Sequence, residues 1–304
     1  SVDNINSYLF NGESVFIESM SSTLCNIPNI GIRNQPIDNG NYLFTEEEKN
    51  IFIEKEPQSK KYFHQWIGSK ELINGYKKYC LWLGNCSENE ISSMPESKKR
   101  VESVRTFRLN SNRVSTKRLS EKPTRFQVEN IPTSNYIIIP RHSSENRAYI
   151  PIVFSDKSTL VGDSCLIVID SSLYELGILS SSMHMAWVRT VCGRIKSDYR
   201  YSASIVYNTF PWPDASEEQK KAVSELADMV LNIRNMYPDK TLAEMYDPDK
   251  MPEPLAEAHH NLDVAVDSLY RNTPFESDEE RLQLLFKLYE KLVAAKNAKE
   301  KPHA

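Results

Sequence analysis

The sequence changes character at Phe210-Pro211-Trp212-Pro213, where two prolines interrupt any regular helix or strand. Beyond this segment, amphipathic helices are predicted over residues 217–236, 255–271 and 278–299. The third of these helices has one apolar stripe, made of Leu282, Leu285, Phe286, Tyr289, Leu292 and Val293. We therefore expect a small all-α domain over residues 214–304, preceded by a domain of different construction over residues 1–213.

The preceding domain contains several strand signals. β-branched residues fill the runs 136–139, 150–154 and 165–169, and polar loops separate these runs, so that one sheet is predicted. Residues 79–83 are typical of another buried strand.

Helices are predicted around these strands. Thr45 and Glu48 form a capping box for a helix that ends before Pro57. A second helix is expected over residues 61–67, and a long helix after Pro95 has an apolar stripe of Val101, Val104, Phe107 and Leu109. Residues 173–178 and 181–191 are also expected to be helical, followed by a loop or strand over 193–207. The fold class is therefore α+β: a mixed β-sheet domain with packed helices, and then the helical domain.

Composition excludes several classes of protein. No apolar run approaches 18 residues and the mean hydropathy is −0.51, so a membrane span is not expected. The five cysteines are an odd set without a C-x-x-C pair, which favours a reducing cytoplasm over secretion. The first residue is Ser rather than Met, so we interpret the chain as a fragment of a longer polypeptide.

Charge is unevenly distributed along the chain. The net charge of −4 argues against a general polyanion binder. Residues 98–125 nevertheless carry ten basic residues against two acidic ones, namely Lys98, Lys99, Arg100, Arg105, Arg108, Arg113, Lys117, Arg118, Lys122 and Arg125 against Glu102 and Glu121. Local charge determines whether a phosphate backbone is attracted, so this run is a candidate for nucleic-acid contact.

The sequence contains no recognisable catalytic or metal-binding motif. It has nine glycines and lacks G-x-G-x-x-G, the Walker motif, G-x-S-x-G and H-E-x-x-H. Pro238-Asp239-Lys240 and Pro248-Asp249-Lys250 faintly resemble a Mg²⁺-dependent nuclease motif, although proline-rich turns between helices explain them better. A stand-alone nuclease and a protein-interaction module stay open as alternatives.

Three unusual motifs occur in order along the chain. The first is Asn34-Gln35-Pro36-Ile37-Asp38-Asn39-Gly40-Asn41; the second runs from Ile139-Pro140-Arg141 to Arg147 and on to Ile152; the third runs from Ser181 through Cys192-Gly193-Arg194 to Trp212-Pro213. Together they closely resemble the C-terminal third of MmeI-like class IIL restriction–modification proteins and their methyltransferase relatives. The resemblance covers roughly residues 5–214.

This resemblance implies a parent enzyme with a nuclease in some members, an S-adenosylmethionine-dependent adenine-N6 methyltransferase core, a target recognition domain and a helical C-terminal domain. The catalytic Asn-Pro-Pro-Tyr motif and the glycine-containing cofactor motif are missing from this chain. We therefore expect the chain to recognise double-stranded DNA without a cofactor of its own. S-adenosylmethionine would belong to the parent, and the methyltransferase domain of that same parent would be its protein partner.

The resemblance also suggests which side chains read DNA bases: Arg141, Asp163, Ser164, Lys196, Asp198 and Arg200. A basic and an acidic side chain together match the major-groove edge of a G·C pair. Lys196 and Asp198, two apart on an extended segment, could serve one pair, and Arg141 with Asp163 could serve another from neighbouring loops. Without the resemblance, a solvated turn is the simpler interpretation of Lys196–Asp198.

Phosphate contacts are expected from Arg105, Arg108, Arg113, Lys117, Arg118, Arg147, Arg189 and Arg194. The alternative for the basic run is a solvated helix face, and Arg189 and Arg194 could instead cap a helix end. Met183-His184-Met185-Ala186-Trp187 is interpreted as helix packing, with His184 as a core histidine, and Phe210 with Trp212 as packing residues.

Overall fold

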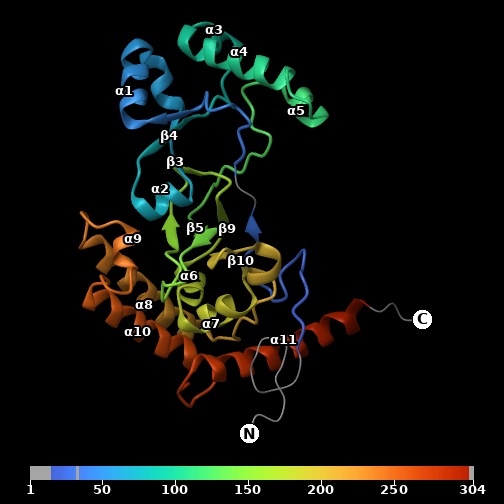
Figure 1. Cartoon of the computed structure of the whole chain (residues 1–304), viewed down its shortest axis with the longest axis vertical. Coiled ribbons are helices and arrows are strands. Elements are labelled where there is room, and N and C mark those ends of the chain that lie inside the picture. Colours follow the sequence, from blue (N-terminus) through green and yellow to red (C-terminus); the bar gives the residue numbers. More distant parts are fainter. Residues whose placement is uncertain (1–14, 32–33, 301–304) are drawn as a thin grey trace. The chain divides into compact units, whose positions relative to one another are not determined.

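The computed structural model describes residues 15–31 and 34–300 (Figure 1). The chain divides into two compact units, each made of separate segments. Unit 1 comprises Ser1–Ile30, Tyr136–Phe154 and Val168–Ala304, and unit 2 comprises Gly31–Asn135 and Ser155–Ile167. Residues on both sides of the predicted boundary at 213 thus lie in unit 1.

Unit 2 is built on a four-stranded sheet with the order β2-β4-β3-β8. Its strands are β2 (Leu43–Thr45), β3 (Phe63–Ile67), β4 (Lys78–Leu81) and β8 (Thr159–Val161). β4 pairs antiparallel with both β2 and β3, whereas β8 pairs parallel with β3. The predicted strand at 79–83 is confirmed. The helix predicted over 61–67 is wrong, because pairing with β4 and β8 satisfies this aromatic segment as a strand.

The helices of unit 2 are α1 (Glu46–Lys55), α2 (Ser69–Asn74), α3 (Glu88–Ser92), α4 (Pro95–Leu109) and α5 (Val114–Leu119), with a 3₁₀ helix over Pro57–Tyr62. The capping box at Thr45 is present as predicted. The predicted apolar stripe of α4 is only half right. Val101 and Val104 are buried, but Phe107 and Leu109 are exposed, and Arg108 takes the next inward position.

Unit 1 holds most of a second sheet, with the order β1-β9-β5-β7. Its strands are β1 (Ile30–Gly31), β5 (Tyr136–Pro140), β7 (Val153–Ser155) and β9 (Cys165–Ile169). The three predicted strands therefore share one sheet. A third sheet, β10-β11-β6, is made of Gly193–Ile195, Asp198–Arg200 and His142–Ser143.

Helices α6 (Leu173–Leu179) and α7 (Ser182–Val191) follow β9, as predicted. Trp187 of α7 is fully buried and packs against Phe210, Phe286 and Tyr289, with ring centroids 5.8–6.4 Å apart. These partners confirm that α7 and Phe210 are packing elements. A π-helix over Ala203–Tyr207 leads from the third sheet toward Phe210.

The helices predicted after Pro213 are present as α8 (Glu217–Asn235), α10 (Glu253–Ser268) and α11 (Asp278–Glu300), with a further short helix α9 (Leu242–Met245). α8 lies against α6, where Gly177 allows a close approach: a Cβ there would be 2.6 Å from Val223 Cγ1. Helices α10 and α11 both contact α7 (Figure 1). Among the described residues, no helix combines the length and the apolar character needed to cross a membrane.

Candidate nucleic-acid interface

A β-hairpin in unit 1 presents three of the predicted base-reading residues. Strands β10 and β11 pair antiparallel, with Gly193 opposite Arg200 and Ile195 opposite Asp198. Lys196, Asp198 and Arg200 are all exposed. Because side chains alternate along a strand, Asp198 and Arg200 share one face, whereas Tyr199 between them is buried on the other.

Lys196 does not lie on the extended segment that the sequence predicted. It occupies the tight turn between the two strands, with the left-handed φ of 56°. The period-two argument that placed Lys196 and Asp198 on one strand face is therefore wrong. Turns of two residues need positive φ, which a lysine adopts at an energetic cost. The structure still places both side chains at the exposed end of the hairpin.

Contacts of Arg194 and Asp198 hold the hairpin in place. Arg194 donates to Ser197 O at 2.8 Å and to Arg189 O at 3.2 Å, and its guanidinium lies 4.2 Å from the Tyr199 ring centroid. Arg194 therefore caps the last turn of α7, to which Arg189 O belongs. Its side chain is also exposed, so the phosphate contact of Arg194 stays a prediction. Asp198 Oδ1 accepts from Glu145 N at 3.3 Å.

Arg141 lies beside the same hairpin. It stands between β5 and β6, and β6 pairs with β11 through Ser143 opposite Tyr199. The Arg141 carbonyl accepts from Tyr201 N at 2.8 Å, and the Arg141 side chain is partly buried. The structure thus brings Arg141 to the three-stranded sheet that carries Lys196, Asp198 and Arg200.

Asp163 and Ser164 lie in unit 2, in the turn that follows β8. Asp163 is exposed, and Ser164 is partly buried, where its Oγ accepts from Ser69 N at 2.8 Å. The turn borders a recess of about 410 Å³. Arg141 belongs to unit 1, so its coupling to Asp163 stays a prediction.

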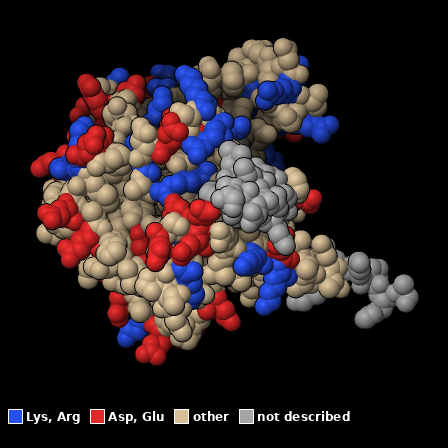
Figure 2. Space-filling model, turned by 60° about the horizontal axis from the view of Figure 1, so that its bottom comes forward, with Lys and Arg blue, Asp and Glu red and all other residues tan. Residues whose placement is uncertain are grey.

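The basic run in unit 2 divides into surface and buried residues. Arg113, Lys117 and Arg118 are exposed on and beside α5, as a phosphate contact requires. Arg105 is partly exposed and forms an ion pair with Glu102, 3.4 Å from Nε to Oε2. On the face shown in Figure 2, Lys and Arg side chains are interspersed with Asp and Glu side chains. This mixture agrees with the nearly equal numbers of the two kinds in the sequence, 37 and 41.

The predicted phosphate contact of Arg108 is wrong, because this side chain has no exposed surface. Its guanidinium donates to five backbone carbonyls, those of Pro36, Ile37, Leu119, Lys122 and Arg125, at 2.7–3.1 Å. Burial lowers the pKa of Arg108 from its ordinary value. Arg108 is therefore an internal tie between loops and cannot reach a phosphate.

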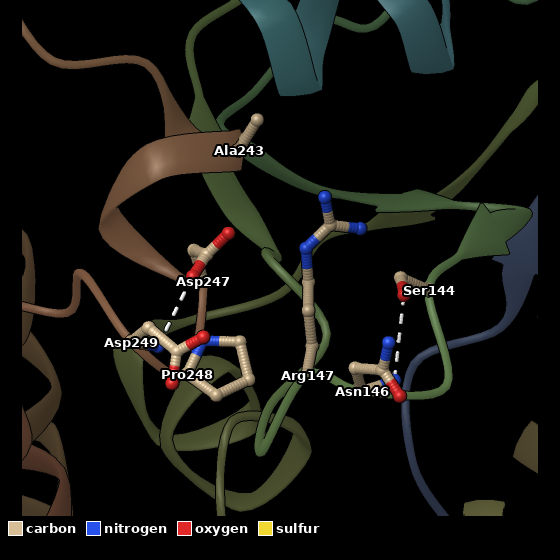
Figure 3. Close-up of a pocket in the computed structure, with 7 residues that line it drawn as sticks. All are labelled: Ser144, Asn146, Arg147, Ala243, Asp247, Pro248 and Asp249. Carbon is tan, nitrogen blue, oxygen red and sulfur yellow. Dashed lines mark hydrogen bonds between the residues drawn. The ribbon is translucent and has the colours of Figure 1, made fainter.

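Arg189 and Arg147 are both partly buried in unit 1. Arg189 Nη1 lies 2.5 Å from Asp278 Oδ2 at the start of α11, so this guanidinium is already paired. Arg147 donates to Ser143 Oγ at 3.2 Å, and burial lowers its pKa. Figure 3 shows Arg147 extending into a pocket of about 400 Å³ between Ser144 and Asn146 on one side and the turn Asp247–Asp249 on the other.

Pro248 and Asp249, which line that pocket, lie in a turn, as predicted for Pro248-Asp249-Lys250. Asp249 N donates to Asp247 Oδ1 at 3.0 Å. Within residues 15–31 and 34–300, no cluster of three or more His, Cys, Asp or Glu side chains is arranged to hold a metal ion.

His184 confirms its predicted place in the core. Its Nε2 lies 3.0 Å from Tyr201 OH, and burial lowers its pKa to about 3. A second buried histidine, His259, lies 2.8 Å from Tyr246 OH and also has its pKa lowered to about 3, chiefly by burial. Both rings are therefore neutral packing groups at ordinary pH.

Sequence reasoning missed the carboxylate that holds α7. Asp263 of α10 accepts from Ser182 N at 2.6 Å, from Ser182 Oγ at 2.6 Å and from Tyr149 OH at 2.7 Å. Ser182 is the first residue of the helix that leads into the hairpin. An acidic residue on the inward stripe of an amphipathic helix was the available signal, because such a residue needs buried partners.

Comparison with known proteins assigns the family. A family model of the MmeI target recognition domain matches residues 11–214, and one of the MmeI C-terminal domain matches residues 215–296. This chain belongs to the MmeI family. The hairpin and the Asp163–Ser164 turn lie in the MmeI target recognition segment, whereas Asp247 and Asp263 lie in the MmeI C-terminal segment.

Two relatives extend this result. DNA methyltransferase A of Bacillus subtilis (strain 168) is 40% identical over 291 residues, covering 96% of this chain and 33% of the relative. The structure of the type IIL restriction–modification enzyme MmeI in complex with DNA matches with a TM-score of 0.91 and 41% identity, covering 96% of this chain and 39% of that one. The chain thus spans about a third of its relatives' length.

Proposed function

We propose that this chain is the part of a site-specific DNA methyltransferase or restriction–modification enzyme that recognises the DNA sequence. One observation supports this most strongly: an MmeI target recognition domain, closely similar to a protein solved with DNA, exposes Lys196, Asp198 and Arg200 on one braced hairpin. Basic and acidic groups side by side match the donor and acceptor pattern of base edges in the major groove. The exposed cations of α5 would add sequence-independent attraction to phosphate.

The chemistry of the parent enzyme would lie outside this chain. An adenine-N6 methyltransferase core in the parent would bind S-adenosylmethionine and accept the target adenine after it leaves the stack, at an unpairing cost of a few kcal/mol. The present residues would hold the duplex in register, so the fragment alone would bind DNA modestly and methylate nothing. A DNA ligand and that methyltransferase partner imply a cytoplasmic location.

Selection from a pool of randomised duplexes tests the proposal. We expect the chain to enrich one short asymmetric sequence, and Lys196→Glu with Asp198→Arg to change the preferred base pair at one position by on the order of tenfold or more. Val264→Ala, at an exposed apolar site on α10, is the matched surface control. No enrichment by the unaltered chain, or an unchanged preference in the double variant, would contradict the proposal. Mg²⁺-dependent cleavage of the pool would instead support the nuclease alternative.

A further inference from the structure

The motif Asn34–Asn41 has no role in the function proposed above, yet the structure holds it in an unfavourable conformation. Ile37 has φ 49°, and Asn39 has φ 53°, which asparagine tolerates far better than isoleucine. Positive φ is rare for β-branched residues, because Cβ crowds the following carbonyl. Such a backbone persists only where surrounding contacts enforce it, and these positions concentrate at ligand sites.

Arg108 provides the first of those contacts. Its Nη2 donates to Pro36 O at 2.7 Å and its Nε to Ile37 O at 3.0 Å, directly at the strained residue. The remaining donors reach the carbonyl of Leu119, the last residue of α5, and those of Lys122 and Arg125 in the loop after it. A guanidinium with no exposed surface thus fixes two loops through backbone atoms alone.

Asn34 attaches the same motif to the turn that carries Asp163. The backbone N–H of Asn34 donates to Val161 O at 2.9 Å, and the side-chain Nδ2 donates to the same carbonyl at 3.2 Å. Gly162, next along the turn, lies directly against the indole of Trp66, since a Cβ there would be 2.5 Å from the ring. Ser164 is held by Ser69. Asp163 is therefore the exposed side chain of a turn whose neighbours are fixed.

The motif and the turn line one recess in unit 2. Gln35, Pro36, Ile37 and Asp38 contribute to its lining together with Asp163 and Ser164. Gln35 is partly exposed, and Asp163 is exposed. A carboxamide both donates and accepts hydrogen bonds, and a carboxylate accepts them, so the pair suits the edge of a nucleobase.

We propose that Gln35–Asp38 is a DNA-reading element of unit 2, with Gln35 contacting bases beside those contacted by Asp163, and that Arg108 is the positioning residue that holds it. This inference rests on the proposed function, since it requires the chain to read duplex DNA. It adds a specificity-determining residue, Gln35, and assigns Arg108 an effect on base selection without contact to DNA.

The experiment uses the full chain and the randomised duplex pool, with preferences determined position by position. We expect Gln35→Ala to weaken selectivity by on the order of tenfold at one or two positions adjacent to those weakened by Asp163→Ala. Selectivity at positions governed by Lys196 and Asp198 should stay unchanged. Gln58→Ala, at an exposed glutamine elsewhere in unit 2, is the matched control and should keep the complete preference.

Arg108→Lys tests the positioning role. A lysine offers three donors where the guanidinium offers five, so the strained loop should relax and selectivity should fall at the Gln35 positions alone. The salt dependence of binding should stay unchanged, because Arg108 does not face solvent. A salt slope lowered by about one would indicate a phosphate contact and overturn this role. A uniform loss at all positions, in proportion to unfolded protein, would overturn it as well.

Failure of the inference is distinguishable from failure of the proposed function. If the unaltered chain selects no sequence, the proposed function fails. If the unaltered chain selects a site and Gln35→Ala selects the same site with the same strength, only the DNA-reading role of Gln35–Asp38 is refuted.

Discussion

The two compact units support their exposed candidate residues in different ways. In unit 1, the hairpin with Lys196 and Asp198 follows a helix anchored by aromatic packing around Trp187. In unit 2, buried polar groups bond to backbone instead: Asn34 anchors the turn with Asp163, and Arg108 anchors the neighbouring Gln35–Asp38 segment. Residues of α11 thus help to support the hairpin of unit 1. The turn of unit 2 is supported by residues of unit 2 itself.

This difference shows that a basic residue cannot be assigned a role from local charge alone. Arg108 and Arg118 are ten residues apart in one basic run, but Arg108 is buried and Arg118 is exposed. Burying a charge is favourable only when hydrogen bonds compensate for lost hydration. The five carbonyls around Arg108 provide that compensation.

The largest effect is expected from removing this buried charge. Arg108→Met should lower the free energy of unfolding by about 3–5 kcal/mol, since five buried carbonyls lose their donor. Arg118→Met on the exposed face should change it by less than about 0.5 kcal/mol. Chemical denaturation measures both values, and hydrogen exchange should show the loss in unit 2 first. Equal effects from the two variants would remove the proposed distinction between buried and exposed arginines.

Acid should affect unit 1 through its buried histidines. Burial lowers the pKa of His259 to about 3, so the unfolded chain takes up a proton near pH 6.5 while the folded chain does not until about pH 3. Stability contributed by the neutral ring is therefore lost as pH falls through this window, by up to about 1.4 kcal/mol per pH unit. Denaturation at pH 7, 6 and 5 should show the decline.

His260 offers the matched control, because it is the exposed neighbour of His259 on α10. His259→Gln should reduce the pH dependence of the free energy of unfolding between pH 6.5 and 5 without abolishing it, because buried His184 still contributes. His260→Gln should leave that dependence unchanged. In unit 2, His64 is only partly buried. Lowering the pH should therefore open unit 1 more readily than unit 2, and hydrogen exchange measures this difference. Faster exchange in unit 2 than in unit 1 at acid pH would contradict this account.

Much of the fold was predictable where local pattern and packing agree. The capping box at Thr45, the strand Tyr136–Pro140 and the helices after Pro213 follow from signals within a few residues. The strand Phe63–Ile67 was not predicted, because its pairing with β4 and with the sequence-distant β8 leaves no signal within the segment itself. Tertiary pairing overrode the local pattern there.

The candidate interface was predictable in composition but not in geometry. The family resemblance indicated Lys196, Asp198 and Arg200, and all three are exposed. The turn conformation of Lys196 could not be inferred, because no glycine marks it. Burial of Arg108 likewise depends on loop carbonyls that only the folded chain brings together.

The smallest effect is expected for exposed cations of the basic run. Arg118→Ala should weaken binding to every duplex alike and lower the slope of log affinity against log salt by about one, because one fewer phosphate is neutralised. Arg234→Lys is the contrasting variant. Arg234 is buried and donates to Tyr246 OH and Ile152 O, so this substitution should leave the salt slope unchanged. Titrating the selected duplex at several salt concentrations measures both slopes. A slope unaffected by Arg118→Ala would exclude this residue from the phosphate contacts and leave Arg113 and Lys117 as the exposed candidates beside it.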